Sequence, residues 1–474
     1  MTRLRSVLGL GILVAALIGG VGSALAQDGG RTPRTEEASD RAAEPEAARP
    51  APETLGALRG APTPWTERAR SGAGLFVMLL LAWALSTKRK EVRWPLVAWG
   101  LGLQLLFGLL VLKTALGQAV FGVLNEGVVQ LLAFTEAGTR FLVGDVLDRE
   151  FTVALNVLPI IVFFSSLMAL AYHLRVVQPV VRAIAWVMQR TLGTSGAETL
   201  SAAANIFVGQ TEAPLVVRPF VAGMTRSELM ALMTGGFATV AGSVLGAYVG
   251  MLRPYFPDIG GHLIAASVMS APAALVIAKV MVPETGDPET AGALELRLDD
   301  PYANVIDAAA GGAADGMKLA VNVAAMLLAF LALVAMLNFL LGLVTAPWTG
   351  TPWTLEGILG VLFWPLAWAM GVPTGDCGAV GRLLGEKIVV TEFVAYVHLA
   401  ETLGEEGALS SRGALIATYA LCGFANFGSI AVQLGGIGGI APERRADLAR
   451  LGLRAMVGGS LAAFMTACVA GLLL

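Results

Sequence analysis

Two glutamates, Glu212 and Glu392, stand in otherwise apolar stretches of the sequence, and each directly follows a threonine. A carboxylate in such surroundings is costly unless a cation or several hydrogen-bond donors face it. Each could pair with a nearby base, Arg218 for the first and Arg382 or Lys387 for the second, and so hold its own segment together. Alternatively, the two carboxylates could bind a polar ligand.

Neutral polar side chains accompany both glutamates. Gln210 and Thr211 precede Glu212, and Asn426 and Ser429 lie three positions apart in a later apolar stretch, a spacing that puts them on one helix face. These amides and hydroxyls both donate and accept hydrogen bonds. Together with the carboxylates they suit a neutral solute that carries several hydroxyl and amide groups, because an anion would require a net positive pocket.

A second group of residues offers oxygen atoms to a cation. Asn205 and Thr239 have side-chain oxygens, and helix breaks at Val208 and Val240 would add free backbone carbonyls. An all-oxygen shell suits a hard cation such as sodium. Proton coupling through one of the two glutamates is the alternative, since a buried carboxylate can titrate near neutral pH.

The composition indicates that lipid surrounds the elements that carry these residues. The chain has 474 residues, of which 56% are hydrophobic and 14% charged, and its mean hydropathy is +0.71. Soluble proteins carry about 25% charged residues, so an integral membrane protein is expected. The net charge of −3 provides no basic surface, which disfavours nucleic-acid binding.

The N-terminal residues are typical of a targeting segment. Residues 1–26 run from a basic start through an apolar stretch to Ala-Leu-Ala, which predicts a cleaved signal peptide, with an uncleaved anchor as the alternative. Residues 27–71 are rich in Pro, Ala, Glu and Arg and are expected to form a disordered linker. The membrane domain is then expected to cover residues 72–474.

About 20 apolar residues cross a bilayer as a helix, and eight stretches of the sequence meet this condition. They are residues 72–87, 94–113, 152–174, 228–252, 260–282, 317–345, 413–434 and 446–474. If the linker is exported, the first loop is cytoplasmic, and it carries Lys88, Arg89, Lys90 and Arg93, as the positive-inside rule requires. Both mature termini are therefore expected on the periplasmic or extracellular side.

Two further apolar segments, about 196–220 and 374–400, contain charges that lipid would penalise. Re-entrant helical hairpins shielded by protein would accommodate them. Each hairpin has a Thr-Glu pair, and each is followed by a Phe-Ala-polar run that ends in Gly-Ser, at 237–243 and 424–429. The span count makes the two hairpins enter from opposite sides, which is the inverted repeat of secondary transporters. The expected fold is all-α and polytopic, with eight transmembrane helices and two re-entrant hairpins.

Three motifs together resemble the concentrative nucleoside transporter family. They are the runs 205–215 (NIFVGQTEAPL), 385–396 (GEK, then TEFVAY at its end) and 424–429 (FANFGS). The resemblance covers residues 72–474. It implies a homotrimer in the bacterial inner membrane that imports nucleosides with sodium, its hairpin-bearing transport domain moving like an elevator against a scaffold.

The resemblance also implies a role for individual residues. Nucleobase binding falls to the first hairpin, at Gln210, Thr211 and Glu212. Ribose binding falls to the second hairpin and the helix after it, at Glu392, Asn426 and Ser429. The pocket would be lined by Val244 and Phe424. Sodium, the co-transported ion, would be held by Asn205, Val208, Thr239 and Val240.

Two positions affect the expected substrate range. Thr391 stands where the family pattern has Asn; Thr keeps a hydroxyl but loses the second donor of an amide, so hairpin packing or ribose geometry is expected to differ, with an effect on affinity and substrate range. Gly209 has no side chain, so the wall beside Gln210 is expected to be open to bicyclic purines. Uptake of adenosine as well as uridine is therefore predicted.

Other functional classes have less support. An intramembrane hydrolase could activate water with paired glutamates, but the sequence has no HExxH motif and no convincing Ser/Lys or Cys/His nucleophile. A sodium channel would need a continuous polar path, whereas the polar residues occur in clusters. No enzymatic activity is expected, and proton-coupled nucleoside symport remains the alternative within the transporter class.

Overall fold

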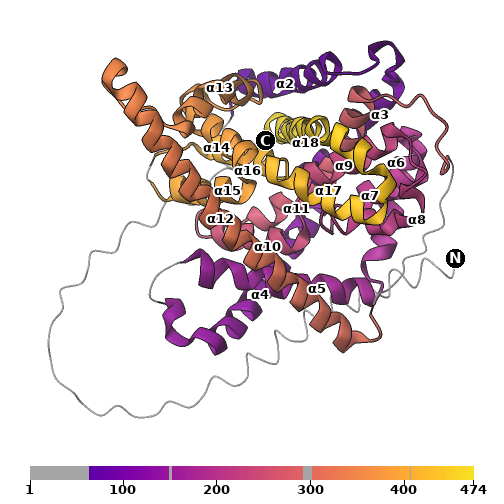
Figure 1. Cartoon of the computed structure of the whole chain (residues 1–474), viewed down its shortest axis with the longest axis horizontal. Coiled ribbons are helices and arrows are strands. Elements are labelled where there is room, and N and C mark those ends of the chain that lie inside the picture. Colours follow the sequence, from indigo (N-terminus) through magenta and orange to yellow (C-terminus); the bar gives the residue numbers. More distant parts are fainter. Residues whose placement is uncertain (1–62, 149–151, 292–301, 406) are drawn as a thin grey trace. The chain divides into compact units, whose positions relative to one another are not determined.

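The computed structural model describes residues 63–148, 152–291, 302–405 and 407–474 (Figure 1). The predicted signal peptide, and residues 27–62 of the predicted linker, lie outside these ranges. Every regular element in the described ranges is a helix. Helix α2 (Trp65–Ala84) begins seven residues before the expected start of the membrane domain at residue 72, so the end of the predicted linker is helical.

Seven described segments are long and apolar enough to cross a membrane. They are Trp94–Lys113, Ala115–Val143, Val153–His173, Arg226–Leu252, Ile259–Met281, Val305–Trp348 and Pro442–Leu473. Six of them match predicted spans. The segment Ala115–Val143 was not predicted, because polar and charged residues such as Gln118, Glu126 and Glu136 interrupt its apolar pattern.

Two predicted spans do not appear among these seven candidates. The first turns of α2 carry Glu67, Arg68 and Arg70, which lower the hydropathy of that helix. The stretch 413–434 lies in two shorter helices, α16 (Ser411–Leu421) and α17 (Phe427–Ile440), rather than in one.

The long helices differ in how much of their surface the rest of the protein covers. Helices α11 (Ile259–Met281) and α18 (Arg445–Leu473) lie in the core, and 89% and 83% of their apolar windows are buried. Helix α11 also packs against α3 (Trp94–Lys113). Cys377, Cys422 and Cys468 are free and buried.

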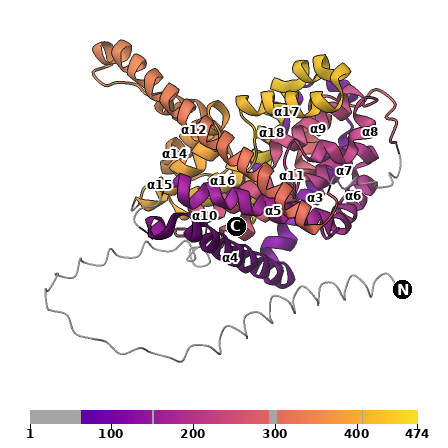
Figure 2. The ribbon, with the colours of Figure 1, turned by 60° about the horizontal axis from the view of Figure 1, so that its bottom comes forward.

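Helix α12 (Val305–Thr349) is a single element of 45 residues, and none of its apolar window is buried. It packs along α5 (Leu158–His173), beside which it runs in Figure 2. Helix α4 (Ala115–Val143) is similarly uncovered, with 6% of its window buried. Apolar side chains on these helices face outward, as they do in a membrane protein whose solvent is lipid.

Two helices are broken at matching places. Helix α9 (Arg226–Ala238) stops where Thr239 takes an extended conformation, and α10 (Gly242–Leu252) resumes three residues later. In the second case α16 ends before Cys422, and α17 starts after Asn426. Gly423 has φ +141° between these two helices, a conformation that L side chains rarely adopt.

The two breaks contact each other through their backbones. A Cβ added at Gly423 would lie 2.7 Å from the carbonyl oxygen of Phe237 and 3.0 Å from that of Ala238. Glycine is therefore required there both by its φ angle and by the close approach of the α9 backbone.

The segments predicted as hairpins are pairs of short helical elements around a turn. In the first, α7 (Gly196–Ala204) is followed by η6 (Ala213–Val217) and the single turn α8 (Arg218–Val221). The second consists of α14 (Cys377–Val389) and α15 (Glu392–Gly404). Two other helices, α6 (Val177–Leu192) and α13 (Leu355–Ala369), pack against α7 and α14 respectively.

Candidate functional site

Glu392 is the first residue of α15, and its carboxylate is 5% exposed. Asn426 donates from Nδ2 to Glu392 Oε2 over 2.8 Å, and Tyr248 donates from its hydroxyl to Oε1 over 3.1 Å. Both donors are neutral. A carboxylate accepts about four hydrogen bonds, so this one keeps capacity for hydroxyl groups of a ligand.

Asn426 is held in one orientation because it also caps α17. Its Oδ1 accepts from the backbone N–H of Ser429 at 2.8 Å, as an N-cap side chain does. The amide nitrogen must then point the other way, towards Glu392. The expectation that Asn426 and Ser429 share a helix face is therefore corrected: Asn426 precedes the helix, and the three-residue spacing is that of a cap.

The pairing of Glu392 with a base, considered from the sequence, does not occur. Lys387 is fully buried, but its Nζ donates to the carbonyl oxygen of Ala420 at 2.8 Å and lies 5.8 Å from the centre of the Phe464 ring. Lys387 thus stabilises the end of α16. Within the described ranges no ion pair joins Glu392 to Lys387 or to Arg382.

Gln210 brings the first hairpin to the same helix, α17. Its side chain is 8% exposed, and its Nε2 donates to Ser429 Oγ over 3.3 Å. The neighbouring Thr211 lies against the α17 backbone, where a Cβ added at Gly436 would be 2.9 Å from its Cγ2. Residues of both predicted hairpins therefore meet at the start of α17, where the helix break exposes the polar side chains of Asn426 and Ser429 to them.

Glu212 follows Thr211 directly, but no side-chain hydrogen bond joins it to this cluster in the described ranges. Its side chain is exposed, and its carboxylate forms no ion pair with Arg218 or with any other residue that the structure describes. A Cβ at Gly209 would collide with this carboxylate. The prediction of an open wall beside Gln210 is wrong, because a glutamate three residues along the turn fills that space.

Asn205 and Thr239 are brought together at the other break. Asn205 ends α7 and is 2% exposed, and its Nδ2 donates to Thr239 Oγ1 and, at 2.5 Å, to the carbonyl oxygen of Gly235. Its Oδ1 is buried and has no hydrogen-bond partner among the described residues. A buried acceptor without a donor is costly, so it indicates a place for an electropositive ligand. This donor set fits a hard cation.

The two remaining predicted cation ligands lie nearby in the chain, one in the turn after α7 and one in the break between α9 and α10. Val240 is fully buried in the interruption between α9 and α10, and Val208 follows the end of α7. A hydrogen bond from the N–H of Gly242 to the carbonyl oxygen of Phe207, 3.2 Å long, connects the break between α9 and α10 to the turn after α7.

Two site residues were missed from the sequence, Tyr248 and Gln433. Tyr248 is fully buried, and its ring stacks on Tyr396 with centroids 4.1 Å apart. Gln433, also fully buried, donates to Gln210 Oε1 at 3.0 Å. Each lies four positions after a predicted residue, Val244 or Ser429, and therefore on the same helix face. Helical periodicity could have found both.

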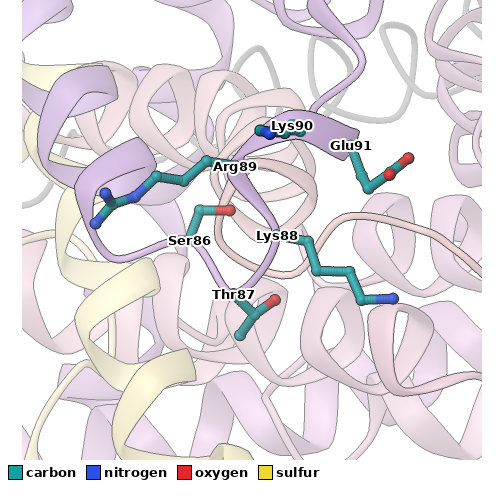
Figure 3. A pocket seen from close by; sticks show the side chains of 6 residues that line it. All are labelled: Ser86, Thr87, Lys88, Arg89, Lys90 and Glu91. Carbon is teal, nitrogen blue, oxygen red and sulfur yellow. The ribbon is translucent and has the colours of Figure 1, made fainter.

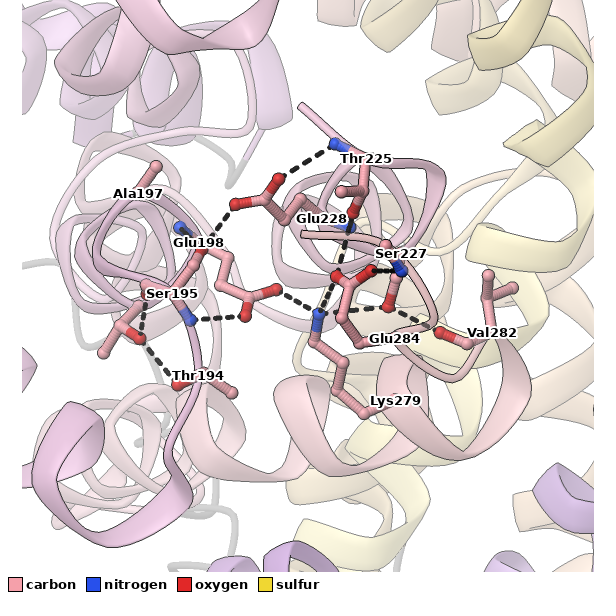
Figure 4. A network of polar contacts seen from close by, with 12 residues as sticks. Thr194, Ser195, Ala197, Glu198, Thr225, Ser227, Glu228, Lys279, Val282 and Glu284 are labelled. Carbon is pink, nitrogen blue, oxygen red and sulfur yellow. Dashed lines mark hydrogen bonds and ion pairs between the residues drawn. The ribbon is translucent and has the colours of Figure 1, made fainter. Parts of the chain in front are cut away.

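A buried ionic network fixes the first hairpin to its neighbours (Figure 4). Lys279 on α11 forms ion pairs with Glu198 at 2.6 Å and Glu284 at 3.2 Å. Ser195, the cap of α7, donates to Glu228 at 2.6 Å, and Glu228 belongs to the capping box of α9. One cation and interlocked helix caps thus hold the starts of α7 and α9 together.

Glu284 lies in this network beyond the end of α11, outside the candidate spans. Burial raises its pKa, but the Lys279 ammonium and hydrogen bonds from Gly286 and Thr225 together outweigh that effect. The pKa of Glu284 is therefore lowered from its ordinary value of 4.5.

A hollow in the surface lies beside the loop between α2 and α3 (Figure 3). It is lined by Ser86, Thr87, Lys88, Arg89, Lys90 and Glu91. Two of its cations are used locally: Lys88 donates to Thr285 at 3.1 Å, and Arg89 donates to the carbonyl oxygen of Ala84 at 2.6 Å. None of the predicted site residues lines it.

Comparison with known proteins identifies the family of the chain. Three family models match consecutive parts of it: Na+ dependent nucleoside transporter N-terminus at residues 73–146, nucleoside recognition (gate) at 154–255, and Na+ dependent nucleoside transporter C-terminus at 262–471. An uncharacterized transporter of Haemophilus influenzae is 44% identical over 406 residues, which cover 84% of this chain and 96% of that protein.

Two animal proteins are similarly related but longer. Solute carrier family 28 member 3 of Eptatretus stoutii is 42% identical over 84% of this chain and 60% of its own length. Sodium/nucleoside cotransporter 1 of Mus musculus is 43% identical over 86% of this chain and 64% of its own length. The chain therefore spans less than two thirds of these relatives.

Solved structures of CNTnw share the fold. An inward-facing, substrate-bound state is 46% identical, covers 85% of this chain and 97% of that one, and superposes with a TM-score of 0.79. A variant in an outward-facing state covers 86% and 99%, with a TM-score of 0.81.

The comparisons define a family of helical membrane transporters rather than of enzymes. The chain belongs to the concentrative nucleoside transporter family, the Na+-dependent nucleoside transporters. The resemblance drawn from the three sequence motifs is confirmed.

Proposed function

We propose that this protein imports nucleosides into a bacterial cell with a sodium gradient as the driving force. The observation that carries the proposal is the meeting of both hairpin segments at one helix break. Glu392 and Gln210, from opposite halves of the chain, each bond to a residue at the start of α17, Asn426 and Ser429 respectively. Carboxylate, amide and hydroxyl groups of this kind match the polar groups of a ribose and a base.

The substrate is proposed to lie between the two hairpins. Gln210, with Thr211 and Glu212 beside it, would face the nucleobase. The ribose hydroxyls would donate to the free lone pairs of Glu392 and contact Asn426 and Ser429. The apolar faces of the base and sugar would pack against Val244, which is buried, and Phe424, which is half-buried.

Sodium is proposed to bind where α7 ends beside the break between α9 and α10. Asn205 Oδ1 and Thr239 Oγ1 would supply side-chain oxygens, and Val208 and Val240 would supply carbonyl oxygens. The unpaired Oδ1 supports this assignment. Gln210 follows Asn205 by five residues in the same turn. A cation bound there would order the turn that carries the base-reading side chain, and this coupling would link sodium binding to substrate affinity.

Transport is proposed to follow an elevator mechanism within a homotrimer of eight-span protomers. In this arrangement α2 and the α16–α17 pair count as spans, whereas α4, whose sequence is interrupted by polar residues, does not. The hairpins would enter from opposite sides as an inverted repeat, and both mature termini would be periplasmic. The paired helix breaks support the repeat, since each half contributes one. Relatives solved in inward-facing and outward-facing states are consistent with alternating access.

Proteoliposomes with separately imposed gradients test the function. Labelled uridine and adenosine should accumulate with sodium outside and should not accumulate with an acid-outside gradient alone. Accumulation driven by the acid-outside gradient in sodium-free buffer would instead establish proton coupling.

Glu392→Gln is the matched loss-of-function variant for that assay. The amide replaces one carboxylate acceptor with a donor, and a hydrogen bond to a charged group is worth about 1.5–3 kcal/mol. Saturable uptake should be lost while the elution volume in size-exclusion chromatography stays unchanged. Uptake like that of the wild type would refute the ribose site.

A further inference from the structure

The base-reading amide of Gln210 is held by the second buried amide, Gln433. Nε2 of Gln433 donates to Gln210 Oε1 at 3.0 Å and to the backbone carbonyl oxygen of Met233 at 3.1 Å. A carboxamide nitrogen has two N–H groups, so both donors of Gln433 are used. Gln433, which is fully buried on α17, therefore has one orientation in its surroundings.

The backbone carbonyl of Met233 determines the orientation of both amides, that is, which neighbours their nitrogen and oxygen atoms face. A backbone carbonyl only accepts hydrogen bonds, so the nitrogen of Gln433, and not its oxygen, must face it. The second N–H of Gln433 then faces Gln210, which must accept this hydrogen bond through its oxygen. The nitrogen of Gln210 is thereby turned to the other side, 3.3 Å from Ser429 Oγ.

Gly236 provides the space for this contact. A Cβ there would lie 2.6 Å from Gln433 Nε2 and 2.9 Å from Gln210 Cβ. Side-chain carbons do not approach other atoms so closely, so an alanine would force one or both amides to move.

Burial of Gln433 would cost free energy without a return if its side chain only filled space. Its Oε1 is buried and has no hydrogen-bond partner among the described residues. A methionine of similar size would fill the same space; it would remove this unpaired acceptor and leave Gln210 Oε1 without its donor, so the number of unpaired acceptors would stay the same. Stability therefore gives no reason for an amide here, whereas the orientation of Gln210 does.

We propose that Gln433 is a positioning residue that fixes the polarity of the base-reading site. It makes Gln210 present its remaining N–H, rather than its carbonyl oxygen, to the ligand. The transporter would accordingly select nucleobase edges that offer an acceptor at that contact. This inference rests on the proposed function, because Gln210 meets a base only if the protein binds nucleosides.

A double-mutant cycle tests the inference. Half-saturating concentrations of labelled uridine are measured in proteoliposomes, at saturating sodium, for the wild type, Gln433→Met, Gln210→Met and the double variant. Gln433→Met should raise the half-saturating concentration about threefold to tenfold, the effect of roughly one neutral hydrogen bond. Maximal rate per folded protein and the sodium concentration for half-maximal uptake should not change, and the midpoint of thermal unfolding should not fall.

The effect must disappear when Gln210 is absent. In the Gln210→Met background, Gln433→Met should leave the half-saturating concentration unchanged. An equal fold-increase in both backgrounds would overturn the inference, because Gln433 would then act by another route. An unchanged value in the single variant would overturn it too.

Gly236→Ala supplies an independent variant. It should raise the half-saturating concentration to a similar extent, whereas Gly439→Ala, in open space on α17, should not. A half-saturating concentration of Gly236→Ala equal to that of the wild type would contradict the inference. If the wild-type protein takes up no nucleoside, the proposed function itself fails. If the wild type takes up nucleoside and the variants have the same half-saturating concentration, only the role of Gln433 is refuted.

Discussion

Tyr248 and Glu392 connect the two halves of the chain through a hydrogen bond of 3.1 Å. Tyr248 lies on α10, which follows the first predicted hairpin, and Glu392 starts the second arm of the other. The tyrosine ring is kept in place by its stack on Tyr396, at an interplanar angle of 24°. The orientation of the proposed ribose-binding carboxylate therefore depends on a residue of the opposite half.

Tyr248→Phe should weaken ribonucleoside binding while the stack on Tyr396 is kept. The carboxylate loses one of its two donors and becomes less well oriented. Because a hydrogen bond to a charged group is worth about 1.5–3 kcal/mol, the half-saturating concentration of uridine should rise about tenfold or more. Tyr396→Phe is the matched control, since its hydroxyl donates instead to the carbonyl oxygen of Thr418 at 2.8 Å. Equal effects of the two variants would contradict the assignment.

Asn205→Ala should raise the sodium concentration needed for half-maximal uptake. The substitution removes a proposed ligand oxygen and the amide that donates to Thr239 Oγ1. Asn338→Ala removes an amide that bonds to Glu356 at 2.9 Å and should leave sodium dependence unchanged. Uptake at varied sodium and fixed pH distinguishes the two variants. A normal sodium dependence of Asn205→Ala would exclude this residue as a ligand.

Thr391→Asn should have little effect on stability, although it restores the residue of the family pattern. Thr391 caps α15 by accepting from the N–H of Val394 at 3.3 Å, and Asn caps helices at least as well. Thr391→Ala, by contrast, should lower the free energy of unfolding by about 1 kcal/mol. Thermal unfolding in detergent measures both. A loss with Asn as large as that with Ala would show that capping is not the role of this hydroxyl.

Glu284→Gln should remove a pH-dependent part of the stability. Because the folded-state pKa of Glu284 lies below 4.5, its charge stabilises the fold above that pH, and the stabilisation is lost as the pH falls through the folded-state value. The variant should therefore be less stable than the wild type at pH 7, with a difference that shrinks below about pH 4.5. Thermal midpoints measured from pH 7 to acid provide the test. A difference that is constant with pH would be inconsistent with this electrostatic role.

The sequence predicts much of the helical framework and the chemistry of the site because both leave local signals. Long apolar runs identify spans such as Ile259–Met281 directly. The motif around Gln210 and the motif around Asn426 are each contiguous, and the glycines between them mark real breaks. Such features need no knowledge of distant contacts.

The remaining features depend on tertiary contacts that no local pattern encodes. The polar residues of α4 interrupt the apolar pattern of a helix that is long enough to cross a membrane. The space beside Gly209 is filled by Glu212, which folds back from three residues along the turn. Lys387 bonds to Ala420 rather than to the nearby Glu392, because helix packing places a carbonyl within its reach. The orientation of Gln210 is set by Met233 through Gln433, residues more than twenty positions away on other helices.

The contact of Gly423 with Phe237 and Ala238 packs the two helix breaks directly against each other. Thr239, at the proposed sodium site, follows Ala238 directly, and Asn426 lies three residues after Gly423. In the proposed transporter, the ion and the nucleoside would therefore be carried on the same piece of backbone. Any movement that carries one of the two sites across the membrane would carry the other with it, so both ligands would be released on the same side.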